Sequence, residues 1–328
     1  MKDKFWRLGL VGYPLGHSLS PRLHSAALDS LNLKGEYRLY PVPPGQDGQP
    51  VLVDLLDRMR RGEVQGLNVT IPHKQAVLPF LDGLTPAAQA IGAVNIIVWH
   101  GNRLLGDNTD APGFLADLER FFSTCHFKPG ALQAVSLQAS PPAQPPHALL
   151  LGAGGAARAV AFALLSSAWQ VTIAARRPEQ ADQLVGSLQP SAISDQPLFL
   201  GHPITAICLS PSGLLEHFSS TDSQSETDLI VNATPLGMYP HIDASPWPAE
   251  VPLPQGAALY DLIYNPAETV LVREARAAGL PATTGLGMLI EQAALAFESW
   301  TGLSVPRKPL WAAVPEFSPL PARERSRG

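Results

Sequence analysis

The stretch from His147 to Ser166 constrains the fold more than any other part of the chain. A short apolar run, His147 to Leu151, leads into Gly152-Ala153-Gly154-Gly155-Ala156-Ala157 and then into an apolar helix. In such a strand–turn–helix unit, the first glycine allows the tight turn and the second lets the backbone approach a pyrophosphate. A small residue in the third place lets the helix pack closely on the strand. The helix N-terminus adds N–H groups for an anion. The pattern predicts a dinucleotide site on a parallel α/β sheet, with a merely tight structural turn as the alternative.

The next predicted strand, Gln170 to Ala174, indicates which dinucleotide. It is followed by Ala175-Arg176-Arg177. A site for NAD usually has Asp or Glu at this point, to hold the ribose 2′-hydroxyl. Arg176 and Arg177 offer guanidinium groups instead, which pair well with a 2′-phosphate. The residues therefore favour NADP over NAD, with a pair of solvated arginines as the alternative.

Composition limits the classes of function. The chain has 328 residues, enough for two domains, and its 23 basic and 28 acidic residues give a formal charge of −5. This balance argues against nucleic-acid binding and against a membrane-surface protein, which normally show a basic face. Two cysteines, Cys125 and Cys208, are too few for a disulfide framework or a paired-cysteine zinc site. No apolar run reaches the ~20 residues of a membrane span, and no signal peptide is recognisable, so we expect a cytoplasmic protein without a metal.

Alternating strands and helices over residues 1–112 predict a small, mainly parallel α/β domain. Ser18 and Ser20 follow the first strand, at the end where open α/β sheets bind ligands. Ser20 before Pro21 also has the pattern of a helix N-cap, which is the alternative role for these serines. The expected strands are Trp6 to Val11, Glu36 to Pro41, Gly66 to Ile71 and about Ala93 to Trp99, and the expected helices are Ser20 to Leu31, Val51 to Arg60 and Lys74 to about Asp82.

More polar side chains gather where the later strands end. Asn68 and Thr70 lie two residues apart, so a strand points both to the same face. Lys74 would begin the next helix, where the helix dipole disfavours a cation. A lysine at this unfavourable position indicates a functional role. The alternative is a solvated surface lysine after an ordinary turn. Asn95 and Asp110 are further polar residues at or near strand ends.

The rest of the chain continues the α/β pattern. A last helix from Gly285 to about Thr301 is apolar at helical spacing, and Gln292 on it is placed to face a cleft. We expect the proline-rich residues 133–147 to be a mobile excursion, Ser219 to Thr227 to be loose, and the last ten residues to be disordered. Further helices are expected at Gly113 to Phe122 and Val270 to Ala278, and further strands are expected from Asp228 and from Leu259, each followed by a proline turn.

Taken together, these motifs resemble the shikimate dehydrogenase family over about Leu8 to Gly302. The resemblance rests on their order along the chain: Gly12-Tyr13-Pro14 to Ser20-Pro21, Asn68 to Lys74, Gly92-Ala93-Val94-Asn95, Asn108-Thr109-Asp110, Gly152 to Arg158, Asn232-Ala233-Thr234, Tyr260-Asp261 to Tyr264, and Gly285 to Gln292. It implies two α/β domains with a cleft between them. Residues 1–112 plus 286–328 would form a discontinuous substrate-binding and catalytic domain, and residues 113–285 a Rossmann-like NADP domain.

The resemblance also implies a reaction and roles for residues. The reaction is the reversible NADPH-dependent reduction of 3-dehydroshikimate to shikimate, a step in aromatic amino acid biosynthesis. Lys74 and Asp110 would be the catalytic pair. Ser18 and Ser20 would hold the substrate carboxylate, and the ring site would be lined by Asn68, Thr70, Asn95, Tyr264 and Gln292. The implied NADP-binding residues are Gly152, Ala153, Gly154, Gly155, Ala156, Ala157, Arg176, Arg177, Thr234, Leu262 and Gly285.

Two departures from the family pattern keep alternatives open. The family often has Asn-Arg-Thr where this chain has Ala175-Arg176-Arg177, and a basic residue where it has Gln180. A quinate or dual quinate/shikimate dehydrogenase using NAD or NADP is therefore the main alternative, although Ser20 and the arginine pair argue against it. A non-catalytic NADP-responsive regulator would have lost Lys74, and a folate-type methylene dehydrogenase would not need the two serines. The oligomeric state stays open, with a homodimer among the alternatives.

Overall fold

The computed structural model describes residues 4–127, 145–188, 203–219 and 227–314. The chain divides into two compact units, which we call unit 1 (Met1–Gly113 with Leu289–Gly328) and unit 2 (Phe114–Met288). The sequence predicts these boundaries at residues 112/113 and 285/286. Each unit is built around one six-stranded sheet with helices packed on it. The predicted α/β class with two domains is confirmed.

The sheet of unit 1 is mainly parallel, as the sequence predicts, and β5 runs against the other five described strands. Its order is β2-β1-β3-β5-β6-β4. β1 pairs in parallel with β2 and β3, whereas β5 runs antiparallel to both β3 and β6. The carboxyl ends of β1, β3 and β6 therefore lie at one edge of the sheet, together with the amino end of β5. The strands are β1 Trp6–Gly12, β2 Gly35–Pro41, β3 Gly66–Val69, β4 Gly83–Leu84, β5 Ile96–His100 and β6 Arg103–Asp107.

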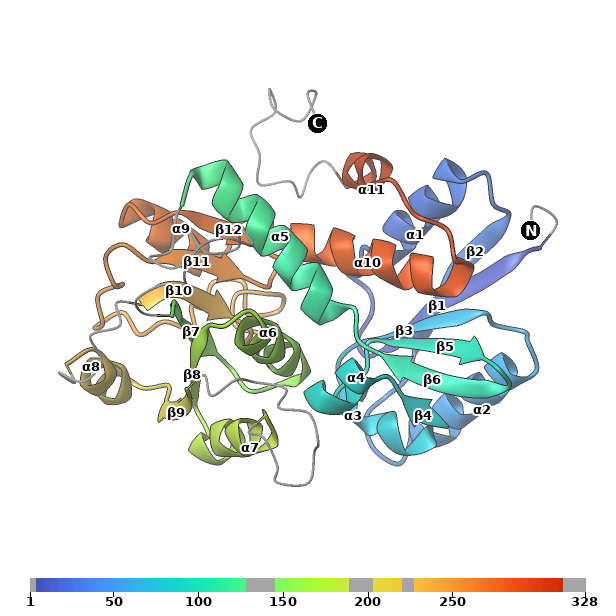
Figure 1. The fold of residues 1–328 in the computed structure, drawn as a ribbon, viewed down its shortest axis with the longest axis horizontal. Helices are drawn as coiled ribbons and strands as arrows, with labels where there is room; N and C mark the ends of the chain where they lie inside the picture. Colours follow the sequence, from blue (N-terminus) through green and yellow to red (C-terminus); the bar gives the residue numbers. More distant parts are fainter. Residues whose placement is uncertain (1–3, 128–144, 189–202, 220–226, 315–328) are drawn as a thin grey trace. The chain divides into compact units, whose positions relative to one another are not determined.

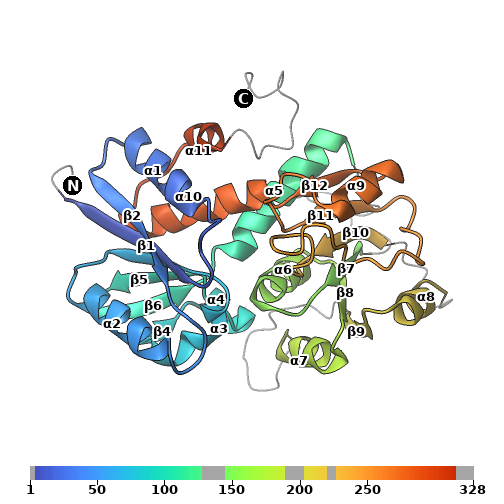
Figure 2. The same cartoon turned by 180° about the vertical axis from the view of Figure 1, so that it is seen from behind.

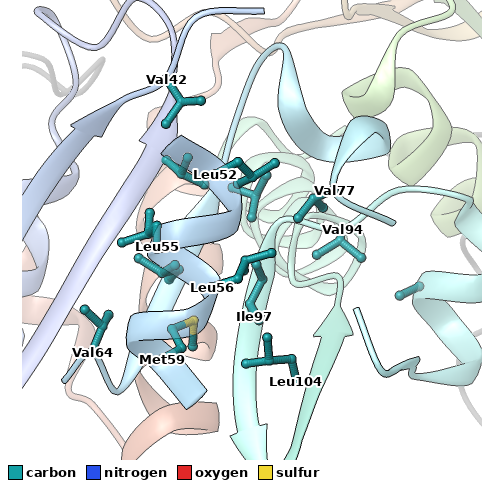
Figure 3. Close-up of a cluster of buried hydrophobic side chains, with 14 residues drawn as sticks. Val42, Leu52, Leu55, Leu56, Met59, Val64, Val77, Val94, Ile97 and Leu104 are labelled. Atoms are coloured by element: carbon teal, nitrogen blue, oxygen red, sulfur yellow. The ribbon is translucent and has the colours of Figure 1, made fainter. Parts of the chain in front are cut away.

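Helices cover both faces of this sheet (Figures 1 and 2). On one face, α2 directs its leucines into a buried cluster with Val94, Ile97 and Leu104 (Figure 3). On the other face lie α1 and α10, where the ring of His24 contacts that of Trp300. The helices are α1 Ser20–Ser30, α2 Gln49–Arg60, α3 His73–Ala76, the 3-10 helix η1 Leu78–Phe80, α4 Pro86–Ile91, α10 Leu286–Thr301, which enters unit 1 at Leu289, and α11 Arg307–Ala313.

The sheet of unit 2 is parallel throughout, in the order β12-β11-β10-β7-β8-β9. The first strand, β7, lies in the middle. The chain moves outward through β8 and β9 on one side, then through β10, β11 and β12 on the other. This is a doubly wound sheet, and its topological switch point lies between β7 and β10. The strands are β7 His147–Leu151, β8 Gln170–Ala175, β9 Ile204–Cys208, β10 Thr227–Asn232, β11 Ala258–Asp261 and β12 Ala282–Thr284.

Both faces of this second sheet are also covered. On one face, residues of α8 and α9 share a core with Leu149, Ile230 and Leu259. On the other, the buried ring of Tyr260 meets the edge of Phe114 from α5. In the described ranges, no helix has both the length and the apolar character needed to cross a membrane. The helices are α5 Asp110–Cys125, α6 Gly155–Ser166, α7 Pro178–Leu188, α8 Pro211–Ser219 and α9 Val270–Ala277.

Two local expectations were wrong. The helix expected from Lys74 to Asp82 ends at Ala76 and gives way to η1, because Pro79 has no N–H with which to continue it. Ser20 is not an N-cap, since α1 begins on the carbonyl of Leu19, which accepts bonds from two following N–H groups. The segments expected to be mobile, loose or disordered lie outside the described residues almost entirely, at 133–144, 220–226 and 319–328.

Candidate active site

Polar side chains of unit 1 converge at the sheet edge where β1, β3 and β6 end. The registers pair Asn68 of β3 with Ile96, the first residue of β5, and pair Ile96 with Asp107, the last residue of β6. Asn95 and Asp110, which flank those strands, therefore arrive beside Asn68. The carboxyl edge of such a sheet is where ligands of α/β proteins bind.

Lys74 and Asp110 form an ion pair at this edge. The ammonium of Lys74, on α3, donates to Oδ2 of Asp110, the first residue of α5. The lysine side chain is 16% exposed and the carboxylate 6% exposed, so the pair is shielded from water but still reachable. Asp110 is well placed for a carboxylate, because the N-terminus of a helix stabilises negative charge. The two groups that the sequence assigned as a pair are brought together.

Asn95 connects this pair to Gln292 of α10. Its amide nitrogen donates to the other oxygen of Asp110, Oδ1, at 2.9 Å, and to the hydroxyl of Thr109 at 2.9 Å. It also lies 3.3 Å from the side-chain oxygen of Gln292. The Thr109 hydroxyl lies 3.1 Å from the main-chain carbonyl of Gln292 and donates to it. The Asp110 carboxylate is therefore held on both oxygens.

Two residues of this network were not predicted, Asn108 and Thr109. The side-chain oxygen of Asn108 accepts from the main-chain N–H groups of Asp110 and Ala111, which caps α5 and fixes the carboxylate. Thr109 ties β6 to α10 as described above. The signal was in the sequence, because a strand followed by Asn-Thr-Asp is a common start of a helix.

The remaining predicted residues of unit 1 lie at the same edge. The Asn68 oxygen accepts from the hydroxyl of Tyr37 at 2.7 Å, and its nitrogen lies 3.4 Å from the main-chain oxygen of Asn95. Thr70 packs against Gly12, where a Cβ would meet the threonine methyl at 2.3 Å. The loop that follows Gly12 carries the two serines.

These serines differ in exposure. Ser18 is half-buried and its hydroxyl accepts from the N–H of Ser20 at 3.2 Å. Ser20 is buried within the first turn of α1. The loop is tied to the end of β3 by a bond from the Tyr13 N–H to the carbonyl of Ile71 at 2.9 Å. Both serines therefore sit at the edge where the polar network gathers.

In unit 2, the predicted glycine turn lies at the switch point of the sheet. Gly152 has φ +106°, a conformation that L side chains rarely adopt, and a Cβ there would approach the carbonyl oxygen of Ala233 to 3.1 Å. Gly154 has open space where a side chain would be and directly precedes α6. Ala157 is fully buried, as close packing of helix on strand requires. The first N–H groups of α6 need partners from outside the helix, so the turn suits an anion.

A second polar network organises the loops beside this turn. The Asn232 oxygen accepts from both the N–H and the hydroxyl of Thr234, at 2.9 and 2.8 Å, and its nitrogen donates to Asp261 at 2.9 Å. Asp261 also accepts from the Thr269 hydroxyl at 2.6 Å and from the Ile263 N–H at 3.0 Å. Burial raises the pKa of Asp261 to about 6, although these three hydrogen bonds each lower it. The support given by Asn232 and Asp261 was not predicted.

The other predicted residues of unit 2 flank these loops. Gly285 lies against Leu262, and a Cβ on it would come within 2.2 Å of the Leu262 carbonyl oxygen. Tyr264 is half-buried and follows β11 in this unit. Arg176 and Arg177 are exposed at the end of β8. Within the described parts of the chain, no cluster of three or more His, Cys, Asp or Glu side chains could hold a metal ion.

Comparison with known proteins matches the chain to shikimate dehydrogenases. Residues 10–97 match the family model of the shikimate dehydrogenase substrate binding domain, and residues 285–314 match that of the shikimate 5'-dehydrogenase C-terminal domain. The chain is 40% identical over 311 residues to the shikimate dehydrogenase (NADP(+)) of Salinibacter ruber, covering 93% of this chain and 95% of that one.

Solved structures agree. A crystal structure of shikimate dehydrogenase in complex with NADP+ matches with a TM-score of 0.75 and 33% identity, over 95% of each chain. The Thermus thermophilus shikimate 5-dehydrogenase in complex with NADP(H) and shikimate matches with a TM-score of 0.72 and 35% identity, over 95% of this chain and 100% of that one.

Proposed function

This chain belongs to the shikimate dehydrogenase family, and on that premise we propose that it is an NADP-dependent shikimate dehydrogenase. It catalyses the reversible reduction of 3-dehydroshikimate to shikimate in aromatic amino acid biosynthesis. The observation that supports this most is the shielded ion pair of Lys74 and Asp110, held by Asn95 at the ligand-binding edge of the sheet. A proton donor and a carboxylate in hydrogen bond are what the reduction of a ring ketone to an alcohol needs.

We propose that Lys74 stabilises the ketone oxygen of the substrate as it becomes negatively charged, and then protonates it. As hydride reaches the carbonyl carbon, negative charge develops on the ketone oxygen, and a nearby ammonium stabilises it and passes a proton. Asp110 keeps the ammonium oriented, and Asn95 and Asn108 keep Asp110 oriented. In the reverse direction Lys74 accepts the proton of the alcohol. When bound, NADPH supplies the hydride.

We propose that the polar groups around this pair bind the substrate. Ser18 and Ser20 offer hydroxyl donors for its carboxylate. Hydroxyls of the ring are matched by amide and hydroxyl groups, which both donate and accept. Their side chains are buried or half-buried, so the bonds they make are not lost to water. The ring-binding residues of unit 1 are Asn68, Thr70, Asn95 and Gln292.

We propose that unit 2 holds NADP. The turn Gly152 to Ala157 fits a pyrophosphate, because Gly154 leaves free the space that a side chain would fill. Thr234, Leu262 and Gly285 belong to loops that are fixed by hydrogen bonds and close backbone contacts. Arg176 and Arg177 are exposed at the end of β8, so their charge suits the 2′-phosphate. Unit 1 is then the substrate domain.

We propose that the protein works in the cytoplasm. Its two cysteines, Cys125 and Cys208, form no disulfide, which fits a reducing compartment.

One experiment tests this function. Initial rates of oxidation are measured with shikimate and with quinate, each with NADP and with NAD, on the purified chain. We expect kcat/KM to be highest for shikimate with NADP. Comparable rates with quinate would establish the dual enzyme instead, and equal rates with NAD would remove the role of the two arginines. No turnover with any pair would refute a dehydrogenase of this class.

A further inference from the structure

Tyr37 reaches the candidate substrate site from a neighbouring strand. It lies on β2 opposite Leu8 of β1, while Asn68 of β3 lies opposite Leu10. Leu8 and Leu10 are two apart, so all four side chains point to the same face of the sheet. Tyr37 thus extends across β1 to Asn68, and its hydroxyl lies 2.7 Å from the asparagine oxygen. Both residues are buried.

The direction of this hydrogen bond follows from the other side of the same amide. The main-chain oxygen of Asn95 only accepts, and it lies 3.4 Å from the Asn68 side chain, so the atom facing it is the nitrogen. The oxygen of Asn68 must therefore face Tyr37, and the phenol donates. One N–H of Asn68 is directed to Asn95, and the second is not used by either of these two hydrogen bonds.

The phenol ring is itself held in place. The imidazole of His24 stacks on it with ring centroids 4.2 Å apart and planes 3° from parallel. The ring of Trp300 also contacts the imidazole, with centroids 5.4 Å apart. Burial lowers the pKa of His24 to about 3, so the stacked ring is neutral. The side chain of Asn68 opposes this lowering, so the imidazole lies beside both Tyr37 and Asn68.

We propose that Tyr37 is a positioning residue for the substrate, because its hydroxyl fixes the Asn68 amide with an N–H donor facing the site. The group recognised is a substrate oxygen that accepts, such as a ring hydroxyl. This inference rests on the proposed function and adds a residue to it that does not touch the substrate. Without Tyr37, the amide is free to turn and present its oxygen instead.

The test compares two identical substitutions on the same strand. Tyr37→Phe removes the donor but keeps the ring on His24. We expect the KM for shikimate to rise about fivefold, the effect of one lost hydrogen bond, with kcat within about twofold. Tyr40→Phe is the matched control, since Tyr40 packs on the opposite face with the cluster of α2, and it should leave both constants unchanged. The two variants should unfold at similar temperatures.

A double-mutant cycle with Asn68→Ala shows whether Tyr37 acts through Asn68. If it does, adding Tyr37→Phe to Asn68→Ala changes the KM no further. A fivefold rise in both backgrounds would mean that Tyr37 acts through general packing, and the inference would be overturned. So would an unchanged KM in Tyr37→Phe alone. The wild-type rate with shikimate and NADP is measured in the same series, so failure of the proposed function shows as an inactive wild type.

Discussion

The two units prepare for their ligands in opposite ways. Unit 1 presents side chains, namely an ammonium, a carboxylate and amides that hydrogen-bond to one another at a sheet edge. Unit 2 presents backbone, with Gly152 in a left-handed conformation and Gly154 beside open space. Its polar side chains, such as Asn232 and Asp261, bond to loops and hold them in shape. A site of the first kind should be most sensitive to removal of atoms, and a site of the second kind to their addition.

The sharpest test of this contrast removes the ammonium from unit 1. Lys74→Ala should lower kcat about a thousandfold, within the range for loss of a positioned acid or base, while the KM for shikimate changes little. The reason is that the ammonium matters most once charge develops on the oxygen. Steady-state rates with saturating NADP measure both constants.

Lys34→Ala is the matched control, because Lys34 is an exposed lysine of the same unit, away from the site edge. It should leave kcat unchanged. Turnover near the wild-type value in Lys74→Ala would show that the ion pair is structural. The side chains of unit 1 would then not act in catalysis as we propose.

The converse test adds one methyl group to unit 2. Gly154→Ala meets no protein atom within 4 Å, so the fold should keep its stability. The methyl would occupy space that we assign to the pyrophosphate, and we expect the KM for NADP to rise roughly tenfold to a hundredfold. The KM for shikimate should stay the same.

Gly186→Ala on α7 controls for the substitution itself, because its Cβ would also point into open space. Alanine is the better helix former there, so this variant should be stabilised by about 0.5–1 kcal/mol with normal KM values. An unchanged KM for NADP in Gly154→Ala would mean that the turn does not approach the phosphates.

The contrast also explains how much of the fold the sequence could predict. Strong local patterns were sufficient for the main strands, for α2 and for the turn before α6. The short strands β4, β6, β9 and β12 were missed, since two to five residues carry too little periodicity. The turn between β5 and β6 could have been predicted from Gly101-Asn102, because these two residue types readily adopt positive φ. Both have positive φ in the structure, as a two-residue hairpin turn requires.

The candidate site shows a different limit. Family motifs pointed to the residues that converge at the edge of unit 1, including Lys74 and Asp110. The supporting bonds were not predictable, because they join distant parts of the chain: Asn95 meets a side chain 197 residues away. Asp261 looked like an ordinary strand end, and only burial and three donors reveal it as the anchor of Asn232. Partners of this kind depend on the tertiary fold.

Acidification should act with opposite signs through two buried groups, His24 of unit 1 and Asp261 of unit 2, while the loss from His147 of unit 2, whose pKa burial lowers to about 4, adds to that from His24. The folded pKa of His24 is about 3 against an ordinary 6.5, so its stabilising effect is complete above pH 6.5 and lost as the pH falls. At pH 5 the loss is about 2 kcal/mol. Asp261 has a raised pKa of about 6 against 3.8, so its contribution is complete below pH 3.8 and lost as the pH rises through 6.

Urea unfolding at pH 7 and pH 5 measures how much of the pH dependence of the unfolding free energy comes from His24. His24→Phe keeps a flat ring against Tyr37 but cannot take up a proton when unfolded, so its stability should fall about 2 kcal/mol less than that of the wild type between these values. His100→Phe, a change at an exposed histidine, should keep the wild-type slope. Equal slopes for all three proteins would contradict the assignment to His24.

The smallest expected effect concerns the one part of unit 2 that relies on side-chain charge. Arg176→Ala should raise the KM for NADP about tenfold, the loss of a charge-assisted contact, and leave the KM for NAD unchanged because NAD has no 2′-phosphate. The measurement is the ratio of kcat/KM for the two cofactors.

Arg177→Ala sharpens the result, since Arg177 stands where the family often has threonine and Gln180 where it often has a basic residue. If Arg177 replaces the missing cation, its loss should change the same ratio by a similar factor. If the ratio changes with neither variant, cofactor choice does not depend on exposed charge at the end of β8. Unit 2 would then select its ligand through backbone shape alone, and the contrast with unit 1 would be complete.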